Sequence, residues 1–403
     1  MNAIRHIRFR RVTRPLRTTF ATSRGSKNSI ASVLVRVTLA GGEEGLGEVP
    51  TSHSWPLETP EAIQAVLGEA PGLLTGVPID DYPARLAALR RGRPRFHMTL
   101  AGLEMALFRA HLASRGRSEF AHWGGRLRRI ETDITIPFVP AGDEIERWMD
   151  YSIRKGFRAY KVKVSGRVDE DLAFVQRVHG RLSRGLAEFA IRLDGNQGYT
   201  RRSCLRMLDA LERRRIAVEL IEQPLRKDDY AGLRGLAARS PVPIILDETV
   251  ASEGDCLRVI EDRLGAGVNI KIAKSGIAGS AAILAAARRA GLKLMIGCMT
   301  ETMVGLSAGI FLAAGTGAFD YIDLDAVHFL HYRSVSGAPI VVEGREYRIA
   351  GRSPIWVSPA ESEEKEEEEE EETEEAAGKM PAGRKGETPS PRAGGTPAMR
   401  RRR

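Results

Sequence analysis

The feature that most constrains the fold is a β-rich apolar segment with a polar end, which recurs eight times from TDITI to YIDLD. Helix-like stretches separate the segments. One polar residue near each segment's end is expected to face inward: Thr135, Lys163, Asp194, Glu222, Asp247, Lys271, Cys298 and Asp323. The gaps between them are 24 to 31 residues, about one strand, one helix and two short loops. This rhythm predicts a (β/α)₈ barrel, whose chemistry lies at the C-terminal ends of its strands.

The flanking regions lack this rhythm. Residues 1–125 begin with alternating segments such as ASVLVRVTLA and continue into helix-like sequence, which predicts a separate α+β domain. The barrel is expected over residues 126–325. Residues 326–357 regain strand character in APIVVEG and EYRIA, and we expect them to return and complete the first domain. A doubly wound open sheet is the alternative fold, which the even gaps and the lack of a glycine-rich nucleotide loop disfavour.

Composition narrows the class of protein. The chain has 403 residues and 42% hydrophobic residues, as is ordinary for a globular protein. No apolar run reaches the length of a membrane span, and the start MNAIRHIRFRR lacks the apolar core of a secretory signal. The three cysteines are widely spaced, which favours a reducing environment over a disulfide framework. A cytoplasmic protein is therefore expected.

The charge is divided unevenly along the chain. Residues 361–403 hold 13 Glu and 9 Lys or Arg, so their net charge is −4. Because the net charge of the whole chain is +9, the preceding 360 residues carry a net charge of +13. The glutamate block ESEEKEEEEEEETEE has almost no apolar residues, so this tail is expected to be disordered. A basic body leaves nucleic-acid binding open as an alternative function.

Three carboxylates are expected to converge at one end of the barrel. Asp194, Glu222 and Asp247 end the third, fourth and fifth segments, which are neighbours in a barrel. Three such groups would repel one another if left alone. Oxygen ligands from adjacent strands suit a hard divalent cation, and we expect one Mg²⁺ per subunit.

Two lysines are expected on opposite sides of this mouth. Lys163 ends the second segment and Lys271 ends the sixth, four strands away in a ring of eight. Lys274 has the wrong parity and follows the strand, so Lys271 is the preferred catalytic amine. Lys161 shares a face with Lys163 in AYKVKVSG, and this like-charge pair is expected to favour a neutral amine at Lys163. A neutral lysine is a competent general base.

Taken together, these motifs resemble a known family. KVKVSG, LDGNQ, IEQPL, LDET, NIKIAKSG and GCMTET, in this order, resemble the muconate-lactonizing subgroup of the enolase superfamily, and within it the dipeptide (L-Ala-D/L-Glu) epimerases. The resemblance covers residues 1–357. It implies a capping domain over the barrel, a magnesium ion on the three carboxylates, and an enolate formed by removal of a proton alpha to a carboxylate or carbonyl.

The resemblance also suggests a substrate. Asp323 and Asp325 resemble the DxD motif with which dipeptide epimerases hold the free α-ammonium of the substrate. Arg24, in the segment FATSRGSKNS, resembles the arginine that contacts the acidic side chain in Ala-Glu epimerases. Lys161, Thr135, Cys298 and Thr300 are expected to line the pocket. The expected function is magnesium-dependent epimerisation of a dipeptide such as L-Ala-D/L-Glu, by two-base 1,1-proton transfer.

Other functions stay open at this stage. Within the subgroup they are an N-acylamino-acid racemase, a succinylbenzoate synthase and a cycloisomerase; outside it, a non-catalytic basic protein that binds nucleic acid. The expected partner is a small dipeptide rather than a membrane, with a homo-oligomer left open. Three departures from the family pattern bear on packing: KSGI for KxGG, Arg109 for the usual Asp, and GRSPIWV for GLG.

Overall fold

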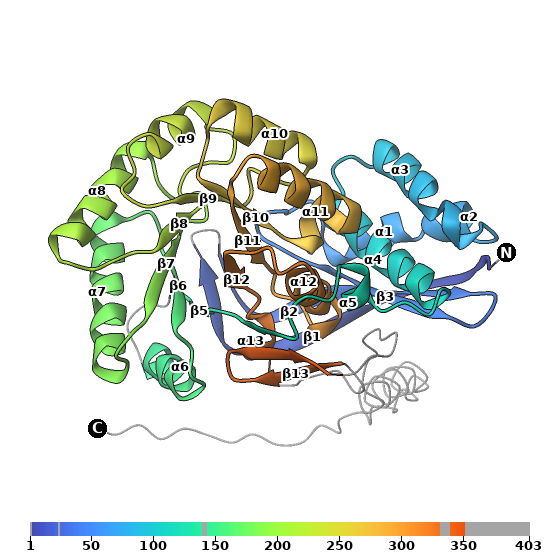
Figure 1. Cartoon of the computed structure of the whole chain (residues 1–403), viewed down its shortest axis with the longest axis horizontal. Coiled ribbons are helices and arrows are strands. Elements are labelled where there is room, and N and C mark those ends of the chain that lie inside the picture. Colours follow the sequence, from blue (N-terminus) through green and yellow to red (C-terminus); the bar gives the residue numbers. More distant parts are fainter. Residues whose placement is uncertain (1, 23–24, 139–142, 331–338, 351–403) are drawn as a thin grey trace, which may run out of the picture. The chain divides into compact units, whose positions relative to one another are not determined.

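The computed structural model describes residues 2–22, 25–138, 143–330 and 339–350, and its central feature is a sheet of eight parallel strands. These strands follow one another in chain order around the barrel (Figure 1). They are β5 (Ile134–Ile136), β6 (Ala159–Lys163), β7 (Ala190–Asp194), β8 (Leu220–Glu222), β9 (Ile244–Leu246), β10 (Gly267–Ile270), β11 (Lys293–Gly297) and β12 (Tyr321–Asp323). Each lies in a predicted segment, so the predicted (β/α)₈ fold is confirmed.

The first and last strands meet to make the barrel nearly closed. The backbone N–H of Asp133, just before β5, donates to the carbonyl of Ile322 in β12 at 3.1 Å. The N–H of Leu324 donates to Thr132 Oγ1 at 2.8 Å. A small apolar cluster comprises the buried strand residues Leu220, Ile245 and Met295, with Tyr321 packed against them.

Among the described residues, seven helices connect consecutive strands and lie outside the barrel (Figure 1). They are α6 (Asp143–Arg154), α7 (Val168–Gly185), α8 (Arg201–Arg213), α9 (Tyr230–Ala237), α10 (Glu253–Asp262), α11 (Ile272–Arg289) and α12 (Met303–Thr316). Local sequence fixes where several begin. Thr200 with Ser203, and Ser252 with Asp255, form reciprocal capping boxes that satisfy the first N–H groups of α8 and α10.

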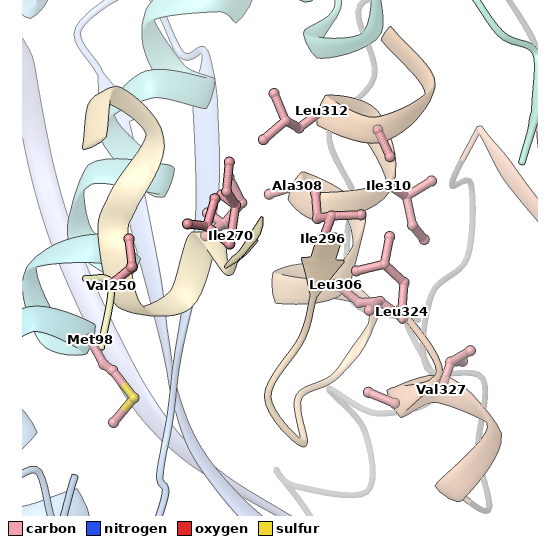
Figure 2. Packing of buried hydrophobic residues seen from close by; sticks show 14 of the residues in the cluster. Met98, Val250, Ile270, Ile296, Leu306, Ala308, Ile310, Leu312, Leu324 and Val327 are labelled. Atoms are coloured by element: carbon pink, nitrogen blue, oxygen red, sulfur yellow. The ribbon is translucent and has the colours of Figure 1, made fainter. Parts of the chain in front are cut away.

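Helix α12 belongs to the main hydrophobic core. Every residue from Met303 to Gly315 is buried, so the helix needs no polar face. Figure 2 shows Leu306 of α12 near Ile296 of β11 and Leu324, which follows β12. The helix also contacts β3 and α5 of the N-terminal domain, so the core continues from the barrel into that domain. None of the helices within the described ranges is long and apolar enough to cross a membrane.

The N-terminal domain pairs an antiparallel sheet with helices, as expected. The sheet contains β1 (Ile4–Thr22), β2 (Gly25–Leu39) and β3 (Glu44–Pro50) in that order. The helices are α1 (Pro60–Leu67), α2 (Ala70–Leu74), the 3₁₀ turn η1 (Ile79–Asp81), α3 (Tyr82–Gly92), α4 (His97–Ala113) and α5 (Glu119–His122). A Cβ on Gly47 of β3 would lie 2.0 Å from the carbonyl oxygen of Gly102 in α4, so glycine allows the two backbones to pack directly.

The KSGI segment joins the barrel to this domain. Gly276 has φ of 72°, which interrupts α11 and which a residue with a side chain rarely adopts. The helix then resumes with Ile277 and Ala278, whose N–H groups donate to the Glu104 carboxylate of α4 at 3.2 and 3.0 Å. The isoleucine that departs from the family pattern therefore contributes its backbone to a buried contact between the domains.

The segment after the barrel returns toward the N-terminal side. Following α13 (Ala326–Phe329), Leu330 forms a bridge with Leu16 of β1. Strand β13 (Ile340–Glu343) then pairs with β14 (Glu346–Ile349), and β14 pairs with β4 (Arg129–Glu131), the strand that precedes the barrel. The expected return is confirmed, while the boundaries 1–125, 126–325 and 326–357 stay predictions. GRSPIWV and the charged tail lie outside the described residues.

Candidate active site

Three carboxylates stand side by side at the C-terminal ends of neighbouring strands. Parallel pairing places Lys163 opposite Asp194, and Asp194 opposite Glu222. Asp247 follows β9 directly, and all three carboxylates are buried. The structure thus brings together the three residues predicted to bind metal.

Each of these carboxylates is held by a polar neighbour. Lys163 Nζ donates to Asp194 Oδ2 at 2.5 Å, and Asn269 Nδ2 donates to Glu222 Oε1 at 2.7 Å. Lys271 Nζ donates to Asp247 Oδ2 at 2.9 Å. The oxygens are therefore fixed in orientation at the mouth of the barrel.

Glu222 tests whether this group suits a cation. Its Oε2 is buried and accepts no hydrogen bond from any described residue. Burial raises the pKa of Glu222 to about 8, and the Asp194 carboxylate beside it adds to the shift. A buried carboxylate oxygen without a hydrogen bond, next to a second carboxylate, is in an environment that a hard divalent ion would stabilise. The donor set fits magnesium.

A second group of carboxylates lies nearby, and sequence reasoning found only part of it. Oxygens of Asp133, Asp323 and Asp325 lie within 4.8 Å of one another, a geometry that can hold a metal ion. Two cations already balance part of the negative charge of this group, because Arg192 donates to Asp133 at 2.7 Å and Lys161 donates to Asp323. Asp133 was missed, although it precedes the inward-facing Thr135 by two residues and so shares its parity.

The two lysines of β6 each have a carboxylate partner. Lys161 contacts Asp323 and lies 3.8 Å from Glu222 Oε2, while Lys163 contacts Asp194. Burial alone would lower the pKa of Lys161, but Asp323 and Glu222 raise it well above the ordinary value. Lys161 is therefore a fixed ammonium. We expected repulsion between Lys161 and Lys163 to dominate their electrostatics. This expectation was incomplete, because it left out the carboxylates of Asp323 and Asp194 that contact them.

Lys271 and Lys274 both reach Asp247. Lys271 follows β10 and lies in the mouth of the barrel, as the parity of the strand predicts. Lys274 was expected to lie away from the interior, and this was wrong: its side chain is 1% exposed and its Nζ donates to Asp247 Oδ1 at 2.6 Å. Strand parity ends at Ile270, and the helix that begins at Ile272 turns Lys274 back toward the site.

The two aspartates of the DxD motif, Asp323 and Asp325, have different neighbours. Asp325 lines the cavity at the barrel mouth, where its Oδ1 lies 3.9 Å from Cys298 Sγ and its Oδ2 accepts the N–H of Thr135. Burial raises the pKa of Asp325, and Asp323 adds to the shift. Asp323 itself is turned toward Lys161. Asp325 is thus the member that faces the cavity.

The cavity is enclosed by residues of both domains. The predicted residues Thr135, Cys298 and Thr300 line it, together with Lys161, Lys163 and Lys271. Arg24 lies outside the described residues. From the N-terminal domain come residues that sequence reasoning missed: Phe20, Gly25, Lys27, Thr51, Ser52, His53 and Ser54. Alternation along β2 offers a sequence signal for Lys27, because Lys27 has the same parity as the apolar positions Val33 and Val35 of that strand.

Glutamine 223 is a further residue that was missed. Its Oε1 accepts the N–H groups of Asp247 and Thr249 at 2.9 and 3.1 Å, and its Nε2 donates to Thr249 Oγ1. It therefore ties the end of β8 to the segment that carries Asp247. Strand alternation does not predict this role, because Gln223 follows the last residue of β8 and has a backbone φ of 32°.

A (β/α)₈ barrel with carboxylates at the ends of three adjacent strands and lysines at the ends of two opposite strands defines a barrel enzyme with a charged site at its mouth. Comparison with known proteins agrees. The family model described as "Enolase C-terminal domain-like" matches residues 144–353. The chain belongs to the enolase superfamily, as an isomerase of its dipeptide epimerase family.

Individual relatives cover most of the chain. It is 30% identical over 336 residues to the L-Ala-D/L-Glu epimerase of Thermotoga maritima, which spans 83% of this chain and 94% of the relative. It is 33% identical over 319 residues to the aromatic dipeptide epimerase of Herpetosiphon aurantiacus, spanning 78% and 88%. The structure of a dipeptide epimerase from Methylococcus capsulatus, complexed with Mg and the dipeptide L-Arg-D-Lys, matches with a TM-score of 0.78 at 26% identity and covers 88% of this chain and 99% of that one.

Proposed function

We propose that this protein is a magnesium-dependent epimerase of dipeptides such as L-Ala-D/L-Glu. The observation that carries the proposal is that Lys163 and Lys271 line one cavity from β6 and β10, four strands apart in the barrel. Carboxylates occupy the strands between them. A planar carbon intermediate held there has one lysine on each face, which is what inversion at an α-carbon requires.

The residues of the chain divide the work. Asp194, Glu222 and Asp247 would hold the magnesium ion, which would supply positive charge to stabilise the negative charge on the substrate's carboxylate. Lys161, a buried ammonium, would bind the same carboxylate. One of the two opposed lysines removes the α-proton, and the other, protonated, donates a proton to the opposite face.

The free amino group of the substrate selects among the reactions of the family. Asp325 presents a carboxylate to the cavity. This group is matched to an α-ammonium, whereas an N-acylated amino acid or a muconate has no cation to offer it. We therefore favour a dipeptide over the substrates of a racemase, synthase or cycloisomerase. Arg24 is proposed to bind an acidic second side chain.

Isotope exchange tests the proposal directly. A library of dipeptides is incubated with the protein and magnesium in deuterated water, and uptake of α-deuterium is read by mass. Lys163→Ala and Lys271→Ala should each stop epimerisation and leave exchange for one epimer only, with opposite preferences. Lys274→Ala is the control, because it should slow both directions equally by loosening Asp247. Exchange in no dipeptide would refute the function, and symmetric loss in both lysine variants would refute the opposed-base arrangement.

A further inference from the structure

The segment that carries Lys271 is a short helical turn with a fixed point at each end. Lys271 follows β10, and its carbonyl accepts the N–H groups of Lys274 and Ser275 at 3.1 Å each. The turn ends at Gly276, where the backbone leaves the helical conformation, and the helix resumes at Ile277. Strand β10 holds the turn on one side, and the start of the resumed helix holds it on the other.

Glu104 of α4, in the N-terminal domain, fixes the start of the resumed helix. Its Oε2 accepts the N–H of Ile277 at 3.2 Å, and its Oε1 accepts the N–H of Ala278 at 3.0 Å. The first N–H groups of a helix have no partner inside it, and a carboxylate is favoured at this positive end of the helix dipole. Glu104 is buried, and Arg90 donates to its Oε2. One domain thus supplies a charged cap to a helix of the other.

Gly276 leaves the space that this carboxylate occupies. A Cβ on Gly276 would lie 2.0 Å from Glu104 Oε2 and 2.6 Å from Arg90 Nη2. The φ of 72° at Gly276 also lets the chain bend between the two helical pieces. Both properties of this glycine therefore serve the approach of Glu104 to the resumed helix.

The opposed lysine, Lys163, is held through a different carboxylate. After β6, the N–H groups of Ser165 and Gly166 donate to Asp171 at 2.7 and 2.9 Å. Asp171 is buried and lies on α7, the next helix of the barrel. The segment after Lys163 is therefore anchored within the barrel, whereas the segment after Lys271 is anchored by the N-terminal domain.

We infer that Glu104 is a positioning residue for Lys271, and so acts on proton exchange at one face of the substrate only. The inference rests on the proposed function and adds a residue to it. If the resumed helix is released, the turn can shift and carry Lys271 with it, and a displacement of about 1 Å can cost a rate about a hundredfold. Any effect that reaches Asp247 through Lys274 is shared by both faces. The ratio of the exchange rates of the two epimers therefore isolates the effect on Lys271.

The test measures α-deuterium exchange at saturating magnesium, separately for the two epimers of a dipeptide that the wild type exchanges. Lys271→Ala identifies the epimer that depends on Lys271, because exchange of that epimer is lost. Glu104→Gln keeps the shape of the side chain but removes the charge and one acceptor oxygen. It should lower kcat for that epimer about tenfold and for the other epimer less than about twofold. KM should stay nearly constant for both, because Lys161 and Asp325 lie on other segments.

Glu58→Gln is the matched control. Glu58 is also a buried glutamate that caps a helix, since it accepts the N–H groups of Met98 and Thr99 at 3.0 and 2.7 Å, but this helix is α4 of the N-terminal domain. The variant should lower thermal stability and leave the ratio of the two epimers unchanged. Glu104→Asp keeps the charge beside Arg90 on a shorter side chain. It should change the ratio in the same direction, to a smaller extent, and it carries the test if Glu104→Gln does not fold.

Three outcomes separate the inference from the proposed function. Equal losses for both epimers in Glu104→Gln, or a loss confined to the epimer that Lys163 serves, would overturn the role of Glu104 while the proposed function stands. Loss of both epimers in Lys271→Ala would overturn the opposed-base arrangement and this role with it. Failure of the wild type to exchange any dipeptide would overturn the proposed function as well.

Discussion

Arg109→Met should destabilise the protein strongly, and in a way that depends on pH. Arg109 and Glu119 are each 2% exposed and form a buried ion pair at 2.8 Å. The guanidinium also donates to the carbonyls of Leu46 in β3 and Val304 in α12, and to Ser307 Oγ. This residue, where the family pattern has Asp, thus connects α4 with α5, β3 and the barrel helix α12.

The magnitude follows from the carboxylate that the variant leaves behind. Burial raises the pKa of Glu119 even with Arg109 beside it. Without the arginine, Glu119 must take up a proton in the folded state, which costs about 3.7 kcal/mol at pH 7, since its ordinary pKa is about 4.3 and each pH unit costs about 1.4 kcal/mol. Lost hydrogen bonds to the two carbonyls add about 1–2 kcal/mol. The free energy of unfolding should therefore fall by about 5 kcal/mol.

The pH dependence has a definite sign. In Arg109→Met the folded state binds one more proton than the unfolded state at any pH between the ordinary pKa of Glu119 and its raised folded value. The free energy of unfolding of this variant therefore falls as the pH rises. The cost of protonating Glu119 in the folded state should be only about 1 kcal/mol at pH 5. Arg109→Met with Glu119→Gln lacks the titrating group, and should lose only about 1–2 kcal/mol at both pH values. Denaturant unfolding followed by circular dichroism at pH 5, 6 and 7 measures both variants. Equal stability of the single and double variants at pH 7 would refute the reasoning.

Three further predictions concern the site. Chelation of divalent metal, or Glu222→Gln, should abolish α-proton exchange and leave the circular dichroism spectrum unchanged; full exchange in excess chelator would remove the metal assignment. Asp325→Asn should raise KM for free dipeptides far more than for their N-acetylated counterparts, because Asp325 is the member of the DxD pair that faces the cavity and the lost contact is with an ammonium, and equal effects would contradict this. Arg24→Met should penalise acidic second residues selectively in the exchange assay, whereas a uniform effect would exclude Arg24 as a specificity residue.

The strands and the inward-facing residues could be predicted because they depend on local periodicity. Asp194 and Glu222 end apolar segments at even spacing, and parallel pairing then places them side by side. The same rule extended inward by one layer would have found Asp133 and Arg192, two residues before Thr135 and Asp194. Lys274 shows where the rule stops, since alternation holds only while the chain stays in the strand.

Contacts between distant segments could not be predicted in this way. Lys161 and Lys163 are a repelling pair in the sequence, but Asp323 and Asp194 on other strands reverse the balance. The sequence identifies the lysines, but only the fold brings carboxylates from other strands next to them. The charge state of a buried lysine therefore depends on the tertiary structure.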